Sequence, residues 1–150
     1  ILTALEQIGE RIPLVFPLPP RTKNRAEQFG LTSRLEEIPN VVLTEPAGYL
    51  DFVALMAESK LVLTDSGGLQ EETTALGIPC ITLRENTERP ITVTEGTNTI
   101  VGCDPELIKR TAIDVLETGG KSGRIPELWD GKTSQRIADV LLQYISANGD

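Results

Sequence analysis

The sequence predicts an α/β fold: a Rossmann-like open parallel sheet with helices on both faces. Short runs rich in Val, Ile and Leu, without alternating polar residues, are typical of strands that are buried on both sides. Helical patterns lie between these runs, and this alternation implies right-handed crossovers between parallel strands. The 150 residues show no internal repeat, low-complexity tract or linker, so we expect a single domain.

Five apolar runs are the expected strands. They cover residues 12–18, 40–43, 60–64, 79–83 and, with a weaker pattern, 99–102. Parallel strands of this kind place their carboxyl ends along one edge of the sheet, where ligands bind in open α/β folds.

Helices are expected between or after the strands. They cover residues 1–8, 48–59, 69–76, 104–118 and 133–146. Asp104 and Pro105 supply a cap and a first-turn proline, whereas Gly77 and Gly119 follow helix ends. The last helix has an apolar stripe, and residues 119–131 are expected to form a surface loop.

Composition excludes several classes of function. The chain has 22 acidic and 14 basic residues, and a net charge of −8 without a Lys/Arg run disfavours nucleic-acid binding. No apolar run approaches the ~20 residues of a membrane span, and no signal-peptide pattern opens the chain. We therefore expect no membrane partner and a cytoplasmic location. Because the chain has no histidine, it has no histidine general base.

The two cysteines, Cys80 and Cys103, are widely spaced and match neither a zinc ligand set nor a disulfide framework. We expect both to be buried, reduced thiols, and we expect no metal and no cofactor. The chain opens with Ile1 inside an apparent helix, which favours a fragment of a longer protein.

The third predicted strand runs into Asp65, and Ser66-Gly67-Gly68 opens the helix that follows. Two glycines allow a ligand to approach the backbone closely, and the unpaired N–H groups and positive end of a helix attract anions. The sequence therefore predicts a phosphate site at this turn. The alternative is a plain strand–turn–helix connection in which Ser66 caps the helix.

Two charged residues near this edge are candidate ligand-binding groups. Glu72 lies about one turn into the helix and would accept hydrogen bonds from ribose hydroxyls if it is aimed past the phosphates. Arg89 follows the fourth strand, where a forked guanidinium would grip phosphate while Glu88 orients it or binds a hydroxyl. The alternatives are a solvated first-turn acid for Glu72 and a surface ion pair for Arg89.

Phe52 and Arg21 complete the candidate set. Phe52 is expected nearly opposite the buried face of its helix, which would consist of Leu50, Val53, Ala54 and Ala57. That position favours stacking on a base or packing against a neighbouring domain. Arg21 follows the stiff, proline-rich exit of the first strand.

These segments resemble, in order, the motifs of the non-hydrolysing UDP-N-acetylglucosamine 2-epimerases. The matching residues are 64–72, 76–79, 87–90 and 95–97, with 16–17, 20–22 and 51–52 upstream and 129–131 and 136–137 downstream. The likeness covers nearly the whole chain, and its centre, from Asp65 to Gly96, is highly specific.

The resemblance implies a two-domain fold of the GT-B type, of which this chain is the C-terminal half, and a homodimer with substrate in the interdomain cleft. The family interconverts UDP-GlcNAc and UDP-ManNAc by anti-elimination of UDP to a 2-acetamidoglucal, followed by re-addition on the opposite face. Carried over by motif, Ser66 and Gly67 would hold the diphosphate and Glu72 the ribose hydroxyls. Arg89 would bind the phosphate region and Phe52 would lie near the uracil.

Two departures from the family pattern affect this expectation. The carboxylates for proton transfer at C2 belong to the missing N-terminal domain, so the chain has no catalytic residue of its own and is expected to be inactive alone. Where the family usually has a histidine between two prolines, this chain has Pro19. This change implies altered activity, a divergent subfamily or an altered sequence.

Two other functions stay open. A GT-B glycosyltransferase that uses a UDP-sugar also carries a Gly-rich turn and a ribose-binding Glu, although residues 87–90 and the absence of an acceptor motif favour the epimerase. The third hypothesis is a non-catalytic nucleotide-sugar sensor. It stays open because Pro19 stands where the family usually has a histidine.

Overall fold

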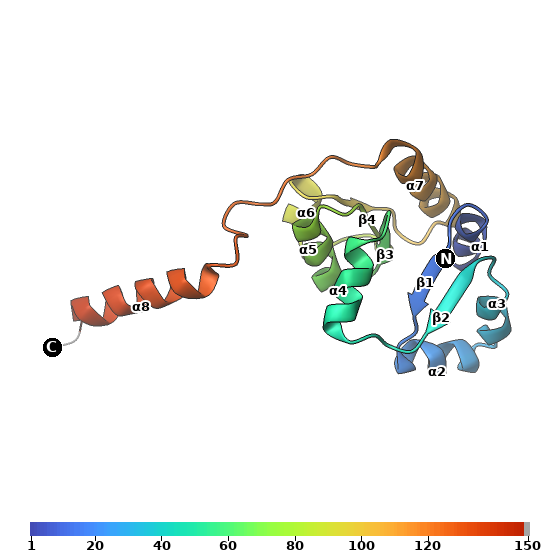
Figure 1. The fold of residues 1–150 in the computed structure, drawn as a ribbon, viewed down its shortest axis with the longest axis horizontal. Coiled ribbons are helices and arrows are strands. Elements are labelled where there is room, and N and C mark those ends of the chain that lie inside the picture. The colour runs from blue at the N-terminus through green and yellow to red at the C-terminus, as the bar shows by residue number, and fades with distance from the viewer. Residues whose placement is uncertain (149–150) are drawn as a thin grey trace.

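A computed structural model describes residues 1–148 and confirms the α/β class (Figure 1). The strands are β1 (Leu14–Pro17), β2 (Val41–Thr44), β3 (Val62–Thr64), β4 (Cys80–Thr82) and β5 (Asn98–Ile100). Each overlaps one of the five predicted apolar runs, and every hydrogen-bonded pair is parallel.

The helices include all five that were predicted and three that were not. They are α1 (Leu2–Gly9), α2 (Pro20–Gln28), α3 (Thr32–Glu36), α4 (Tyr49–Ala57), α5 (Gly67–Leu76), α6 (Pro90–Thr94), α7 (Pro105–Thr118) and α8 (Thr133–Asn148). The missed helices are α2, α3 and α6. In α2 only Ala26 is buried, so this helix lacks the apolar period that identifies a helix in sequence.

The strands form two ladders instead of one continuous hydrogen-bonded sheet: β1 pairs with β2, and β3, β4 and β5 pair in that order. The N–H groups of Leu14 and Leu18 donate to carbonyl groups of residues 40 and 44, so the even positions of β1 face β2. The odd positions face the opposite edge, and two of them are Pro13 and Pro17, which have no N–H to donate. This edge of β1 therefore has few donors with which to extend the ladder.

The two ladders nevertheless share one hydrophobic core. Its buried members are Ala4, Ile8, Ile81, Val101, Ile108, Ala112 and Val115. Leu14 of β1 and Leu63 of β3 both pack against this cluster. Helices α1 and α7 lie side by side and contribute buried residues to it (Figure 1). Burial of apolar area thus joins the two ladders where backbone hydrogen bonds do not.

Helix α4 buries a different face from the one predicted. Met56 is 3% exposed and Phe52, one turn earlier, is half-buried, whereas Leu50 is 79% exposed. Ala54 and Ala57 are exposed as well. The expectation that Phe52 lies opposite the buried face is therefore wrong. The physical reason is that the larger Phe and Met side chains remove more apolar area from water than two alanines do.

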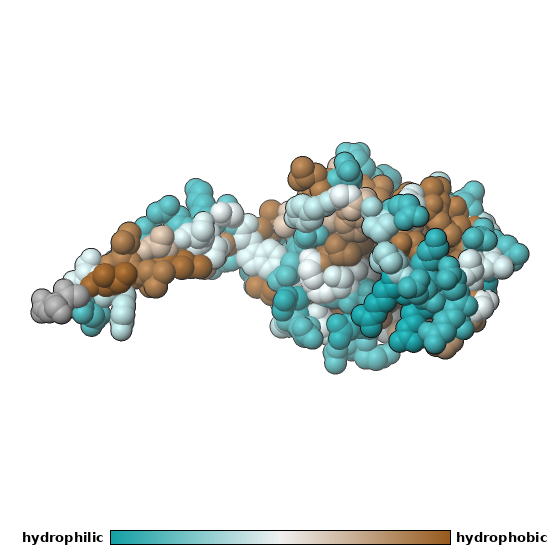
Figure 2. Space-filling view, turned by 90° about the horizontal axis from the view of Figure 1, so that it is seen from below, coloured by the Kyte–Doolittle hydropathy of each residue, from teal (hydrophilic) through white to brown (hydrophobic). Residues whose placement is uncertain are grey.

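The apolar stripe of α8 is not buried. Figure 2 shows the helix extending from the body of the molecule with apolar residues on its surface. Ile137 is 54% exposed and Tyr144 is 67% exposed. Of the helices within residues 1–148, none combines the length and the hydropathy that crossing a membrane requires.

Residues 119–132 contain neither helix nor strand, as predicted, but part of this loop packs tightly. A Cβ atom on Gly123 would lie 2.5 Å from the carbonyl carbon of Gly96, and Arg124 donates its N–H to the Glu95 carbonyl oxygen at 2.8 Å. The loop therefore runs along the segment that joins α6 to β5, and only glycine fits at position 123.

The two cysteines lie in different environments, and both are free thiols. Cys80 is 1% exposed, and burial raises the pKa of its thiol, whereas Cys103 is exposed. The prediction of a buried thiol is right for Cys80 and wrong for Cys103. Cys103 lies outside the core because it follows the last strand, in the connection before α7.

We expect a thiol reagent to label Cys103 but not Cys80 in the native state, because only the thiolate of an accessible thiol reacts quickly. Peptide mapping by mass spectrometry measures the label on each residue, and denaturant is expected to expose Cys80. The Cys103→Ser variant is the control for the assignment. Native labelling of Cys80 at a similar rate would contradict the burial of this thiol.

Candidate functional site

The turn between β3 and α5 has the features of an anion site. Ser66 occupies the N-cap position of α5, but its hydroxyl makes no capping hydrogen bond. The Ser66 N–H donates to the Thr64 hydroxyl at 3.0 Å. Within residues 1–148, the N–H groups of Gly67 and Gly68 have no acceptor, and the first bond of the helix is from Gln70 N–H to the Ser66 carbonyl oxygen. The free donors lie at the positive end of a ten-residue helix.

The space above this turn is open. The nearest atom to a Cβ built on Gly67 is Arg89 Cγ, at 3.7 Å, and for Gly68 it is Ser66 Oγ, at 3.9 Å. Both distances are ordinary contacts, and neither glycine has a positive φ. Nothing in the described chain therefore requires glycine at these two positions. At Gly96, in contrast, a Cβ would lie 2.4 Å from a side-chain oxygen.

Arg89 lies against the turn, as the hypothesis of a phosphate site requires. Its Nε is 3.0 Å from Oε1 of Glu71, and its Nη1 donates to the backbone carbonyl oxygen of Glu88 at 3.3 Å. The carboxylate that orients Arg89 is therefore that of Glu71, and the expectation that Glu88 does so is wrong. The pair is partly solvated, since the side chains are 43% and 40% exposed. Among residues 1–148, Nη2 makes no hydrogen bond.

A buried polar cluster behind Arg89 was missed by sequence reasoning. Gln70 is 1% exposed, and Asn98 and Thr92 are 0% exposed. The Asn98 amide donates to Gln70 Oε1 at 3.2 Å and to the Thr92 hydroxyl at 3.0 Å. The available signal was the presence of polar residues in and beside segments expected to be buried, but sequence alone does not show which of them meet.

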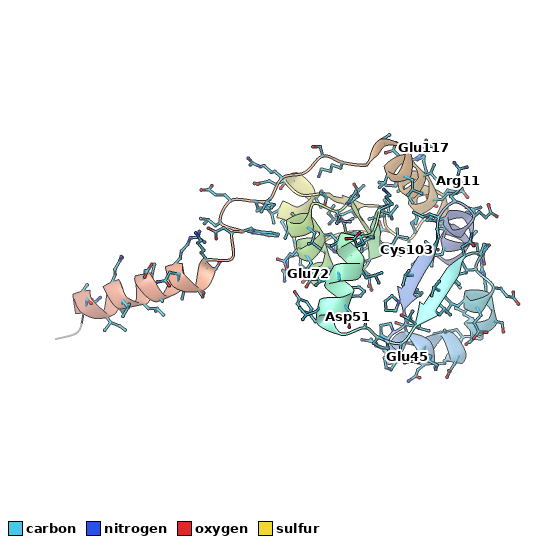
Figure 3. The ribbon with its side chains drawn as sticks, viewed as in Figure 1. Arg11, Glu45, Asp51, Glu72, Cys103 and Glu117 are labelled. Atoms are coloured by element: carbon cyan, nitrogen blue, oxygen red, sulfur yellow. The ribbon has the colours of Figure 1, made fainter. Side chains whose placement is uncertain are left out.

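Glu72 is half-buried on α5, on the side of the molecule from which α8 extends (Figure 3). It lines a shallow hollow of about 300 Å³ together with Glu71, Ala75 and Trp129. Among residues 1–148 the Glu72 carboxylate has no hydrogen-bond or ion-pair partner, so its oxygens are free to accept hydrogen bonds. Trp129, the single tryptophan of the chain, was not among the predicted site residues.

The remaining predicted residues lie on other helices. Arg21 is exposed in the first turn of α2, after Pro19 at the N-cap and Pro20 at the first position. Phe52 lies in α4, which packs beside α5. The places of Arg21 and Phe52 in a ligand site stay predictions.

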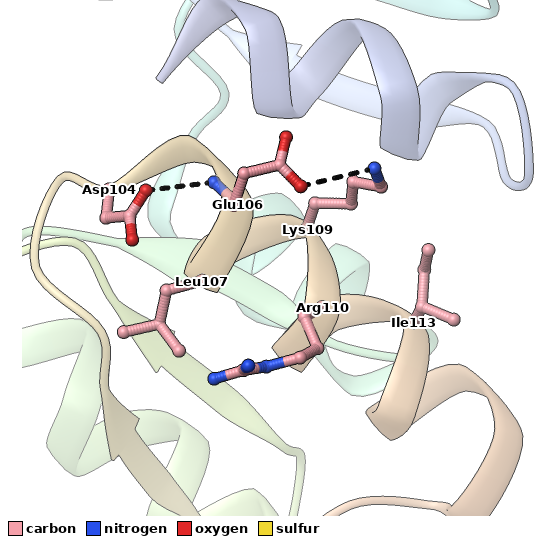
Figure 4. A pocket seen from close by; sticks show the side chains of 6 residues that line it. All are labelled: Asp104, Glu106, Leu107, Lys109, Arg110 and Ile113. Carbon is pink, nitrogen blue, oxygen red and sulfur yellow. Dashed lines mark hydrogen bonds and ion pairs between the residues drawn. The ribbon is translucent and has the colours of Figure 1, made fainter.

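A second hollow, of about 490 Å³, lies along α7 (Figure 4). Its lining residues are Asp104, Glu106, Leu107, Lys109, Arg110 and Ile113. Asp104 accepts from the Glu106 N–H at 3.1 Å, and the Glu106 carboxylate lies 3.5 Å from Lys109 Nζ. These polar groups satisfy one another, and no predicted site residue lines this hollow. The described residues contain no cluster of three or more side chains placed to hold a metal ion.

Comparison with known proteins identifies similar sequences. A family model described as UDP-N-acetylglucosamine 2-epimerase matches residues 1–142. The UDP-N-acetylglucosamine 2-epimerase of Methanocaldococcus jannaschii is 43% identical over 129 residues, which cover 85% of this chain and 34% of that protein. The protein of the same name from Methanococcus maripaludis is 39% identical over 136 residues, covering 83% of this chain and 37% of that protein.

Solved structures agree with the sequence comparison. The M. jannaschii UDP-GlcNAc 2-epimerase in complex with UDP-GlcNAc and UDP has a TM-score of 0.79 and 37% identity, covering 94% of this chain and 41% of that chain. The Neisseria meningitidis UDP-GlcNAc 2-epimerase bound to UDP-GlcNAc has a TM-score of 0.77 and 32% identity, covering 95% and 40%. In these four comparisons the chain therefore spans only 34% to 41% of the length of the matched protein.

Proposed function

This chain belongs to the UDP-N-acetylglucosamine 2-epimerase family, and we propose that it is the UDP-binding half of an enzyme that interconverts UDP-GlcNAc and UDP-ManNAc. The observation that carries the proposal is the open turn at Gly67 and Gly68, whose free N–H groups lie beside Arg89. A diphosphate is the part of the substrate that this arrangement suits, because main-chain donors and a guanidinium both favour a dense negative charge.

The local charge of the site offsets the acidity of the whole chain. A net charge of −8 repels a nucleotide at long range, but that field is screened within about 10 Å at 0.1 M salt. At contact distance the helix N-terminus and the guanidinium of Arg89 decide the interaction. The Glu71 carboxylate lies 3.0 Å from Nε of that guanidinium and orients it.

The other predicted residues contact the ribose, the uracil and the phosphates. Glu72 accepts hydrogen bonds from the ribose hydroxyls, and its unpaired carboxylate supports this role. Phe52 lies near the uracil and Arg21 near the phosphates; the family resemblance supports both assignments. Neither a metal nor a cofactor is part of the proposal.

In the proposed reaction the C1–O bond to UDP breaks as the proton leaves C2, which yields the 2-acetamidoglucal and UDP. This chain stabilises the negative charge that develops on the leaving diphosphate. It also keeps UDP in place, so that re-addition to C1 occurs while C2 is protonated on the opposite face. The carboxylates that move the proton belong to an N-terminal domain, and the intact protein is a cytoplasmic homodimer.

Solvent exchange at C2 tests the proposal. We expect the intact protein that carries this chain to incorporate deuterium at C2 of UDP-GlcNAc in D₂O, as measured by NMR, and the 150-residue chain alone to incorporate none. Heat-inactivated protein is the control for uncatalysed exchange. Transfer that requires an acceptor and leaves C2 unlabelled would favour the glycosyltransferase. Binding of UDP without turnover would favour the sensor, and either result would overturn the epimerase.

A further inference from the structure

We propose that Gln70 and Asn98 are positioning residues, which hold the backbone of Arg89 against the phosphate turn through the hydroxyls of Thr87 and Thr92. The inference rests on the proposed function, because it assigns Arg89 to the binding of the diphosphate. Arg89 is the last residue of a connection, residues 83–89, that is neither helix nor strand, and it is the N-cap residue of the five-residue helix α6, where its carbonyl oxygen accepts the Thr92 N–H at 3.0 Å.

The N–H group of Arg89 is held on one side of this connection. It donates to the Thr87 hydroxyl oxygen at 2.9 Å. Because that oxygen acts as an acceptor for Arg89, its own proton is directed elsewhere, and it donates to Gln70 Oε1 at 2.5 Å. The Thr87 hydroxyl thus relays the position of α5 to the N–H group of Arg89.

The carbonyl group of Arg89 is held on the other side. The Thr92 hydroxyl donates to the Arg89 carbonyl oxygen at 2.7 Å and accepts from the Asn98 amide at 3.0 Å. The same amide nitrogen donates to Gln70 Oε1 at 3.2 Å. The hydrogen bonds therefore form a closed ring from Gln70 through Thr87, Arg89, Thr92 and Asn98 back to Gln70.

Every group in this ring has a determined polarity. Gln70 Oε1 accepts twice, the Asn98 amide donates twice, and each hydroxyl accepts once and donates once. The Arg89 carbonyl oxygen can only accept, so the Thr92 hydroxyl donates to it and accepts from the Asn98 NH₂ group, and Asn98 Oδ1 accepts from the Thr82 hydroxyl at 2.6 Å. Since Gln70 and Asn98 are at most 1% exposed, water does not compete for the bonds between these two side chains, whereas the bond from the Arg89 N–H to the Thr87 hydroxyl lies at the surface.

The ring ties Arg89 to the helix that carries the phosphate donors. Gln70 lies two residues after Gly68 on α5, and Glu71, the next residue, pairs with the Arg89 side chain. The ring thus places the backbone of Arg89 while Glu71 orients its guanidinium. Phosphate donors and Arg89 belong to one rigid unit, so the ligand does not have to order Arg89 on binding.

The Thr87→Val variant tests the ring, because valine keeps the shape of threonine and removes the hydroxyl. We expect the UDP affinity of the intact protein, measured by calorimetry, to fall about fivefold, in the range of one lost hydrogen bond. Thr87→Ser restores the hydroxyl and is expected to stay within about twofold of the original affinity. Thr94→Val removes an exposed hydroxyl of α6 outside the ring and is the matched control, with unchanged affinity.

A double-mutant cycle separates positioning from general stability. Arg89→Ala is expected to weaken UDP binding about tenfold, and Thr87→Val is expected to have no further effect in that background. If Thr87→Val weakens binding equally in both backgrounds, the positioning role is wrong and the proposed site stands. If Arg89→Ala leaves the affinity unchanged, the proposed site and the positioning role both fail. Circular dichroism verifies folding, and Thr87→Ala replaces any Thr87→Val protein that is misfolded.

Discussion

The Gly67→Ala variant is expected to bind UDP about thirtyfold more weakly, a loss of about 2 kcal/mol, without any loss of folding stability. The added Cβ meets no atom of the described chain closer than Arg89 Cγ, at 3.7 Å, so the fold accommodates it. Alanine is also the better helix former, by about 0.5–1 kcal/mol. In the proposed site, however, the methyl group occupies the space in which a phosphate oxygen reaches the N–H groups of the turn.

Calorimetric titration with UDP and a thermal unfolding curve measure these two effects separately. Gly77→Ala is the matched control, because Gly77 follows the other end of α5 with φ of +73°. That variant is expected to lose about 1 kcal/mol of stability and to keep its UDP affinity. If Gly67→Ala binds UDP normally, the diphosphate does not lie on this turn.

The Asn98→Leu variant is expected to lower the free energy of unfolding by about 3 kcal/mol. Leucine removes both donors and the acceptor of a side chain that is 0% exposed. The Thr82 hydroxyl, also 0% exposed, then loses the acceptor of its proton, and an unsatisfied buried group costs about 1–3 kcal/mol, whereas the Thr92 hydroxyl keeps its bond to the Arg89 carbonyl oxygen. The apolar area that leucine buries offsets part of this cost.

Urea unfolding followed by circular dichroism measures the change. Asn24→Leu, at an exposed position of α2, is the control and is expected to stay within about 0.5 kcal/mol of the original stability. A loss of less than 1 kcal/mol for Asn98→Leu would mean that the polar cluster adds little to the stability of the fold. The ring would then have to be tested by its effect on binding alone.

Local chemistry explains why so much of the element order was predictable. A residue such as Asp104 caps its helix through a bond to the N–H two residues later, at 3.1 Å, and Gly77 adopts a positive φ that other residues avoid. Both effects act within a few residues of chain, so they are visible without the fold. Helix α2 was missed because its polar surface leaves no periodic signal.

The turn at residues 66–68 and its proximity to Arg89 were also predictable, because parallel strands place their carboxyl ends along one edge of a sheet. The partner of Arg89 was not. Glu71 and Glu88 are both acids near the turn, and only the tertiary structure shows that the Glu71 carboxylate lies within 3.0 Å of Nε. The buried face of α4 was misjudged for a similar reason, since neighbouring elements decide which side chains lose solvent.

The sequence by itself determined the α/β class, the five strands, the glycine turn at the start of α5 and the family to which the chain belongs. These depend on residue type and local spacing. Only the tertiary structure decided that β1 and β3 do not share a ladder, that Cys103 is exposed and that Gln70 and Asn98 meet behind Arg89. These depend on contacts between residues far apart in the chain, and such contacts are set by packing, which no local pattern encodes.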